Sequence, residues 1–278
     1  MNLGATVARF VVLSALLTSV SASGTLIMAF CNGNALYLGS DSLQTTTDYS
    51  YTNHVQKIRA VGTNCCVSLS GFSRWTSQVQ GRTREFDFLD QMEGALRKTE
   101  SSRRPLPAIT NAVMEFEKWY RKCCGKAVAG GTTNSYGPVF TFWGYDRRLN
   151  RFCGLGWACS GTNRGVFQET YDSRGHAGRL FLQGESDFLS AFISNPNNFP
   201  TVTLSDRSKQ TWDRVALYEA VSEEELVAEM VELFALHKLH AATFSPHSGH
   251  IAEPYVIWRL RRDGAKMLGA FRPDKGGD

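Results

Sequence analysis

The chain has 278 residues, of which 42% are hydrophobic and 20% are charged. These proportions are close to those of ordinary globular domains, so they exclude a disordered chain, a collagen-like chain and a membrane protein with many spans. Thirty basic and 26 acidic residues leave a net charge of only +4. This small excess gives no indication of a surface for nucleic acid, and no nucleic-acid partner is expected.

The first 24 residues have a composition of their own. Arg9 is the only charged side chain before Thr25, and it is followed by an apolar run over 10–17 and then by small residues up to Gly24. This order is typical of a secretory signal peptide, with cleavage after Ala22 or after Gly24. The apolar run is too short to span a bilayer, so no stable membrane anchor is expected. The alternative is a pro-segment. The protein is therefore expected to be secreted or periplasmic if 1–24 is a signal peptide, and cytoplasmic otherwise.

Short apolar runs separated by turn residues follow Thr25. They predict four strands joined as hairpins in an antiparallel sheet, at 25–30, 35–40, 55–60 and 65–69. Apolar residues at three- and four-residue intervals then predict two helices, over 75–98 and 107–122. Two further strands are expected at 139–143 and 152–159.

The second half of the chain is less regular. Residues 163–212 are rich in Gly, Ser, Asn and Asp, and no helix or strand is assigned to them. They are treated as an insertion. Ser222 and Glu225 have the spacing of a capping box, which predicts a helix from Ser222 to about His240. A hairpin around Asp263-Gly264 is expected to follow. Because strands occur in hairpins and helices in consecutive groups, the order predicts an α+β fold in which helices cover antiparallel sheets.

A chain that began at Thr25 would carry its own catalytic pair. The threonine hydroxyl is a nucleophile, and its free α-amine, with an ordinary pKa of about 7.7–8.0, is a base. A buried cation would lower the pKa of that amine, a carboxylate would hold the cation, and a glycine N–H after a strand would bind an oxyanion. Asp41, Lys57 and Gly71 follow Thr25 by 16, 32 and 46 residues and offer these three groups.

The segments that contain these residues resemble the catalytic β-type subunits of the proteasome family. They are Gly24-Thr25-Leu26-Ile27, Leu38-Gly39-Ser40-Asp41-Ser42, Lys57-Ile58-Arg59 and Ser70-Gly71. Those proteins are N-terminal-nucleophile hydrolases with a threonine, aspartate, lysine and oxyanion glycine at these offsets, and they free the threonine by cutting a Gly-Thr bond.

The resemblance implies a four-layer αββα sandwich, built from a single domain over 25–278. It implies a threonine peptidase without cofactor or metal, which cuts peptides or unfolded proteins and assembles into a homo-oligomeric ring. Thr25, Asp41, Lys57 and Gly71 would be catalytic, and Gly24 would be the processing residue.

Weaker matches extend the resemblance. Ser160, in Cys159-Ser160-Gly161, resembles the serine of a family loop that lies near the nucleophile, although it comes seven residues late. Val55 and Leu69 occupy the positions that line the pocket for the residue before the cut bond, which would be shallow and apolar. Ser245 stands where the family has an aspartate.

Other interpretations stay open. The chain could be a non-catalytic ring subunit that keeps the fold, or an N-terminal-nucleophile amidase that acts on small amides. Asp41 could be a turn residue, Lys57 a solvated edge charge and Gly71 a turn glycine. Four histidines could form a zinc site, but capping or exposed histidines are more common; they are His237, His240, His247 and His250.

Overall fold

The computed structural model describes residues 25–45, 51–52, 55–62, 65–71, 74–79, 82–99, 105–123, 136–160, 165–176, 180–184, 186–202, 204–206, 209, 221–244 and 251–273. The predicted signal peptide and Gly24 lie outside the described residues, as do Ser245, His247 and His250.

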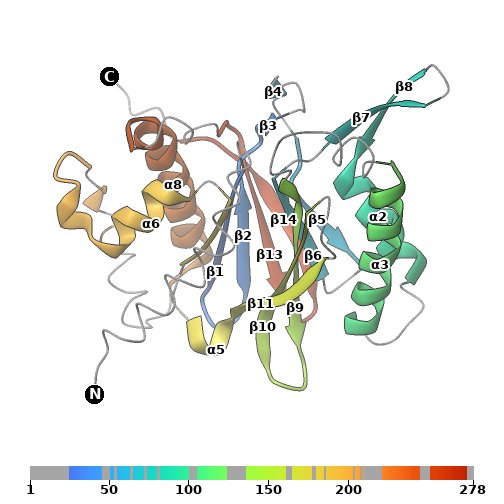
Figure 1. Ribbon diagram of the computed structural model, residues 1–278. Helices are drawn as coiled ribbons and strands as arrows, with labels where there is room; N and C mark the ends of the chain where they lie inside the picture. Colours follow the sequence, from blue (N-terminus) through green and yellow to red (C-terminus); the bar gives the residue numbers. More distant parts are fainter. Residues whose placement is uncertain are drawn as a thin grey trace.

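Two five-stranded antiparallel sheets form the centre of the molecule (Figure 1). The first sheet has the order β12 (Leu180–Gly184), β1 (Leu26–Cys31), β2 (Leu36–Ser40), β13 (Tyr255–Arg261) and β14 (Gly264–Phe271). The second sheet has the order β11 (Val166–Asp172), β10 (Arg151–Ser160), β9 (Tyr136–Asp146), β6 (Cys65–Ser70) and β5 (Ile58–Val61). Two short hairpins stand apart, β3 (Gln44–Thr45) with β4 (Tyr51–Thr52) and β7 (Arg74–Val79) with β8 (Arg82–Asp87).

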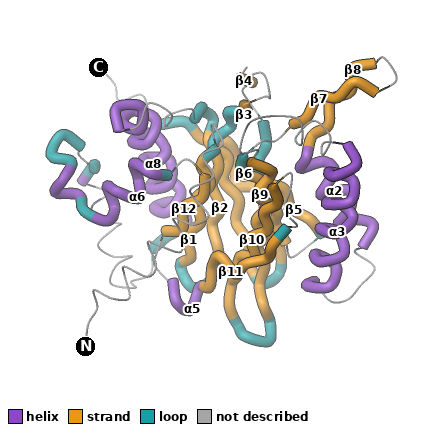
Figure 2. Tube along the Cα trace, in the orientation of Figure 1, coloured by secondary structure: helices purple, strands orange, loops and turns teal. Residues whose placement is uncertain are grey.

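Helices lie on the outer faces of both sheets, as Figure 2 shows. Helices α8 (Glu223–Phe244) and α6 (Asp187–Ser194) pack in one apolar cluster with β1, β2 and β13. Helices α2 (Phe88–Thr99) and α3 (Pro105–Cys123) pack in another with β6 and β9. A third cluster contains apolar side chains from both sheets, including Ile27, Ile58, Trp143 and Trp258. The predicted α+β class with two antiparallel sheets is confirmed, and this arrangement is that of a sandwich.

Two short helical segments complete the described elements, α5 (Ser173–His176) and the 3-10 helix η1 (Pro196–Asn198). Within the described residues, no helix combines the length and the apolar character needed to cross a bilayer.

The predicted capping box at the start of α8 is present. The Ser222 N–H donates to the Glu225 carboxylate at 2.8 Å, and the Glu225 N–H donates to the Ser222 hydroxyl at 3.2 Å. These reciprocal bonds satisfy backbone donors that a helix start leaves unpaired. The helix extends to Phe244, a few residues beyond the expected end.

Two sequence predictions are wrong in the first half of the chain. The expected helix over 75–98 begins only at Phe88, because the residues before it form the paired strands β7 and β8. Asp87 fixes the start of the helix, since its carboxylate accepts hydrogen bonds from the N–H groups of Leu89 and Asp90. The four strands before Gly71 also do not form one sheet: β1 and β2 belong to the first sheet, and β5 and β6 belong to the second.

Residues 163–212, which the sequence left unassigned, contribute to both sheets. β11 forms one edge of the second sheet and β12 forms one edge of the first. Leu26, the residue after Thr25, lies opposite Gly184 at the end of β12. This segment therefore borders the predicted nucleophile.

The aromatic side chains near α2 and α3 pack against one another. Phe86 contacts Trp119 edge-to-face with ring centroids 5.5 Å apart, and Phe88 contacts both Phe116 and Tyr120. Contacts within the chain therefore account for these aromatic side chains, so they give no support to a ring interface. The expectation of a ring therefore depends on the family resemblance.

Candidate active site

The four central site residues come from the two sheets in pairs. Thr25 directly precedes β1 and Asp41 follows β2, and these antiparallel neighbours bring the start of one strand beside the end of the other. Lys57 directly precedes β5 and Gly71 follows β6, in the same relation within the second sheet. The Leu69 N–H donates to the Lys57 carbonyl at 3.0 Å and ties these two strand ends together.

A buried ion pair joins the two sheets at this end. The Lys57 Nζ lies 2.9 Å from Oδ1 and 3.0 Å from Oδ2 of Asp41. The relative exposure is 0% for Asp41 and 3% for Lys57. Removal of one member of such a pair leaves an uncompensated charge in a buried site, which is strongly unfavourable. The pair is therefore a fixed part of this end of the molecule and not a solvated edge charge.

Asp41 has further partners that keep it in place. Its carboxylate accepts hydrogen bonds from the N–H of Leu26 at 2.9 Å and from the N–H of Leu43 at 3.0 Å. Burial has the largest influence on the pKa of Asp41 and raises it, while the Lys57 ammonium and the two N–H groups act in the opposite direction. Because Leu26 follows Thr25 in the chain, the same carboxylate that holds Lys57 also holds the backbone beside Thr25.

Thr25 is almost enclosed, with 3% of its surface exposed. On one side it is bounded by the end of β12. Gly184 has a φ of +89°, and a Cβ at this position would lie 1.9 Å from the Thr25 carbonyl oxygen. Only glycine allows this approach, because any side chain would displace one of the two backbones.

Gly71 has the backbone conformation that its predicted role requires. Its φ is +83°, which glycine adopts without strain and other residues rarely adopt. This turn at the end of β6 is where the sequence predicts an oxyanion-binding N–H. The conformation also fits a simple turn glycine, so the role of Gly71 stays a prediction.

The remaining predicted site residues, Val55, Leu69 and Ser160, lie in different surroundings. The Val55 N–H donates to the Ser42 carbonyl at 3.0 Å, which places half-buried Val55 beside the residue after Asp41. Leu69 is buried in the cluster beneath α2 and α3. Ser160 ends β10 opposite Tyr136, and its side chain is not among the described ones.

Sequence reasoning missed two residues at this site, Gln183 and Gly184. Gln183 is buried, although it ends an apolar run, and its amide bonds to side chains of the second sheet. Both residues belong to the segment 163–212, which the sequence left unassigned. The available signal was an apolar run that ends in a polar residue and a glycine, Leu180-Phe181-Leu182-Gln183-Gly184, which is a strand that ends at a turn.

The histidines offer no metal site among the described residues. His237 is fully buried on α8 and contacts the ring of Phe188, and His240 stacks on the same ring with centroids 5.5 Å apart. Within this part of the chain, no group of three or more His, Cys, Asp or Glu side chains is arranged to hold a metal ion. Burial lowers the pKa of His237 to about 4, so this imidazole is neutral near neutral pH.

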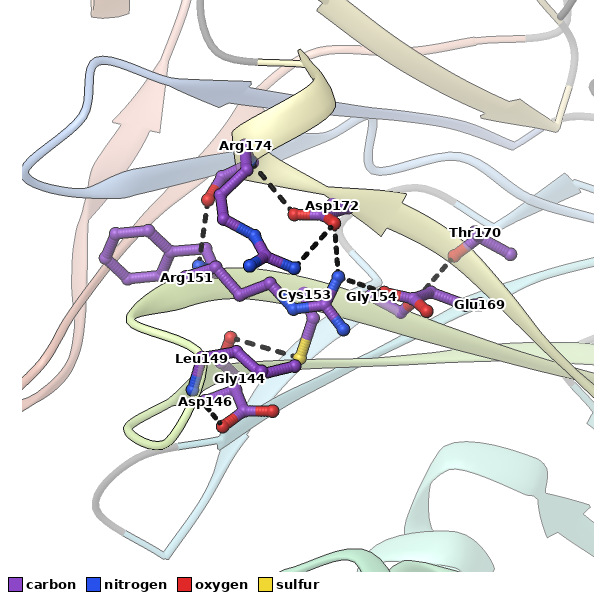
Figure 3. A network of polar contacts seen from close by, with 12 residues as sticks. Gly144, Asp146, Leu149, Arg151, Cys153, Gly154, Glu169, Thr170, Asp172 and Arg174 are labelled. Atoms are coloured by element: carbon purple, nitrogen blue, oxygen red, sulfur yellow. Dashed lines mark hydrogen bonds and ion pairs between the residues drawn. The ribbon is translucent and has the colours of Figure 1, made fainter.

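A second polar network lies at the opposite end of the second sheet (Figure 3). Arg151, at the start of β10, forms ion pairs with Asp172 and, at 2.6 Å, with Glu169. In the register of the sheet, Arg151 lies opposite Asp146, at the far end of β9. Ser70 lies opposite Val139, near the start of β9. The network joins the ends of neighbouring strands and stands apart from Thr25.

Comparison of the chain with models of known protein families and with curated proteins finds no match. The geometry of the site therefore carries the functional assignment.

Proposed function

We propose that this chain is an N-terminal threonine hydrolase that cuts peptide bonds, similar to the β-type subunits of the proteasome. One observation supports this more than any other: the buried carboxylate of Asp41 holds both the Lys57 ammonium and the N–H of Leu26. A buried cation held beside the first residue of β1 is what an N-terminal nucleophile needs. In a non-catalytic relative the same ion pair would contribute to stability alone.

In the proposed reaction, cleavage after Gly24 frees the α-amine of Thr25. The Thr25 hydroxyl attacks the carbonyl carbon of the substrate, and its proton passes to the Thr25 amine. The Lys57 ammonium lowers the pKa of that amine toward neutrality and favours the developing alkoxide. Asp41 keeps Lys57 charged and oriented.

The attack forms a tetrahedral intermediate with a negative oxygen. In this proposal the N–H of Gly71 donates to that oxygen. In other hydrolases, removal of one such donor lowers kcat by about 10²–10³-fold. The intermediate collapses, the amine product leaves with the proton that the Thr25 amine had accepted, and an ester joins the substrate to Thr25. Water then attacks the acyl carbon of this ester, and the bond between that carbon and the threonine oxygen breaks. The carboxylic acid product leaves, and the free hydroxyl of Thr25 is restored.

The proposed substrates are peptides or unfolded protein segments. Val55 and Leu69 would line a shallow apolar pocket for the residue before the cut bond. Because one methylene in such a pocket changes discrimination by only about 1–3 kcal/mol, selectivity among small and medium apolar residues would be modest. A homo-oligomeric ring and an exported location belong to the same proposal.

The test compares wild type with Thr25→Ala on a panel of fluorogenic peptides and small amides. Wild type is expected to hydrolyse peptides with apolar residues before the cut bond, and Thr25→Ala is expected to be inactive. Hydrolysis of the small amides alone would favour the amidase. A wild-type protein with a free Thr25 that cleaves nothing would favour the non-catalytic subunit.

A further inference from the structure

The proposed site is divided between two sheets, so its geometry depends on how the sheets are aligned. Thr25 and Asp41 belong to the first sheet, and Lys57 and Gly71 belong to the second. Apolar contacts between the sheets are not directional and tolerate small shifts. The Asp41–Lys57 pair fixes the position of the lysine side chain, and it reaches Gly71 only indirectly, through the backbone hydrogen bond between Leu69 and Lys57.

A second polar connection crosses between the sheets, from Gln183. The Thr141 hydroxyl donates to the Gln183 Oε1 at 2.8 Å, and the Gln183 Nε2 donates to the Ser70 hydroxyl oxygen at 2.9 Å. Gln183 is 9% exposed, and Ser70 and Thr141 are buried. Both ends of the Gln183 amide therefore have partners on the second sheet.

On each sheet this connection lies close to a residue of the proposed site. On the first sheet, Gln183 lies opposite Ile27 and directly before Gly184, the residue that approaches Thr25. On the second sheet, Ser70 directly precedes Gly71. The connection thus joins the neighbours of the proposed nucleophile to the neighbour of the proposed oxyanion donor.

We propose that Gln183 is a positioning residue that sets the distance between Thr25 and the N–H of Gly71. This inference rests on the proposed function. A hydrogen bond fixes its two heavy atoms within a few tenths of an ångström, whereas an apolar side chain of similar size would fill the same space without fixing Ser70. A misplacement of about 1 Å can lower a catalytic rate by about 10²-fold, so Gln183 acts on turnover without touching the substrate.

The experiment uses three single variants of the full chain and the double variant of Gln183→Leu with Ser70→Ala. Gln183→Leu keeps the volume and removes both hydrogen bonds, and Ser70→Ala removes only the acceptor on the second sheet. Ser173→Ala is the matched control, because Ser173 is a buried residue whose hydroxyl accepts a hydrogen bond from the Phe152 N–H at 2.9 Å, at the opposite end of the sheets. For each protein, kcat and KM are measured with one fluorogenic peptide, together with unfolding by denaturant and amide hydrogen exchange of the segment 65–71.

Gln183→Leu and Ser70→Ala are expected to lower kcat by about 10- to 100-fold, with KM changed by less than about threefold. The double variant is expected to lose no more than either single variant, because both remove the same connection. Hydrogen exchange in 65–71 should rise in both, and Ser173→Ala should keep the wild-type kcat.

Other results would overturn the inference in distinguishable ways. A kcat within twofold of wild type in Gln183→Leu or Ser70→Ala would refute the positioning role while the hydrolase proposal stands, and so would an equal fall in Ser173→Ala. If Gln183→Leu fails to fold, Ser70→Ala decides. A wild-type protein with a free Thr25 and no hydrolysis would end both proposals before any variant is measured.

Discussion

Lys57 and Asp41, from opposite sheets, meet in one ion pair in which Nζ lies 2.9 and 3.0 Å from the two carboxylate oxygens. The same carboxylate binds the N–H of Leu26. One side chain thus fixes the cation and the backbone beside Thr25, so stability and the proposed catalysis share the same contacts.

Single and double replacements of this pair separate the two effects. Lys57→Met leaves the Asp41 carboxylate without its buried cation, and Asp41→Asn leaves the Lys57 ammonium without its carboxylate, so each is expected to lower the free energy of unfolding by about 3–5 kcal/mol. Each should also lower peptide turnover by about 10²–10⁴-fold. The double variant should regain part of the stability, because no unpaired charge is left, but none of the turnover. Denaturant unfolding measures the stability of each variant, and kcat measures its turnover. A double variant with turnover within tenfold of wild type would refute the proposed role of the pair.

Gly184 provides a test of the close approach to Thr25. Gly184→Ala would place a Cβ 1.9 Å from the Thr25 carbonyl oxygen, so we expect Thr25 to be displaced and hydrolysis to fall by more than about tenfold. Gly33→Ala is a matched control, because Gly33 has a φ of +88° and nothing within 4 Å of the added atom. Both variants incur the left-handed backbone cost of about 1–2 kcal/mol. If the two variants retain equal activity, the approach has no functional importance.

His237 predicts a pH dependence of stability. Its pKa is about 4 in the folded protein and 6.5 in its ordinary state, so between these values the unfolded chain binds more protons. The free energy of unfolding should therefore fall as the pH is lowered from about 6.5 to about 4, with a slope of at most about 1.4 kcal/mol per pH unit from this group. Above pH 6.5 the effect is absent.

Denaturant unfolding between pH 4 and 8 checks this slope. His237→Leu should lose that part of the pH dependence, and His240→Gln, which replaces a partly exposed histidine on the same helix, should keep it. An unchanged slope in His237→Leu would assign the pH dependence to other groups.

The sequence predicted much of the site because its signals are local. Thr25, Asp41, Lys57 and Gly71 lie at the ends of β1, β2, β5 and β6, all within one stretch of the chain, so their spacing could be compared with a known motif without knowledge of the whole fold. The capping box at Ser222 was readable for the same reason, since its two residues lie three positions apart.

The rest depended on contacts between distant segments. β12 pairs with β1 across more than a hundred residues, and no local pattern shows that Gln183 and Gly184 reach the start of the chain's first strand. The prediction of a helix over 75–98 is wrong because it continued the helical spacing from Phe86 back to residue 75, through residues that form a hairpin. Asp87 marks the true start of the helix.

Two routes could free Thr25, and Thr25→Ala separates them. If signal peptidase cuts after Gly24, this variant should still begin at residue 25. If the peptidase cuts after Ala22 and Thr25 then attacks the preceding carbonyl, the variant should retain Ser23-Gly24 at its N-terminus. The second route agrees better with the small residues before Ser23. In that case Thr25→Ser should be trimmed slowly and keep some activity.

The most direct test of the account is the N-terminal residue of purified, active wild-type protein, measured by intact mass. The proposed chemistry uses the free α-amine of Thr25 as its base, so the active chain is expected to begin at Thr25. An active protein that begins at Ser23, or at Met1, would contradict the assignment of Thr25 as the nucleophile.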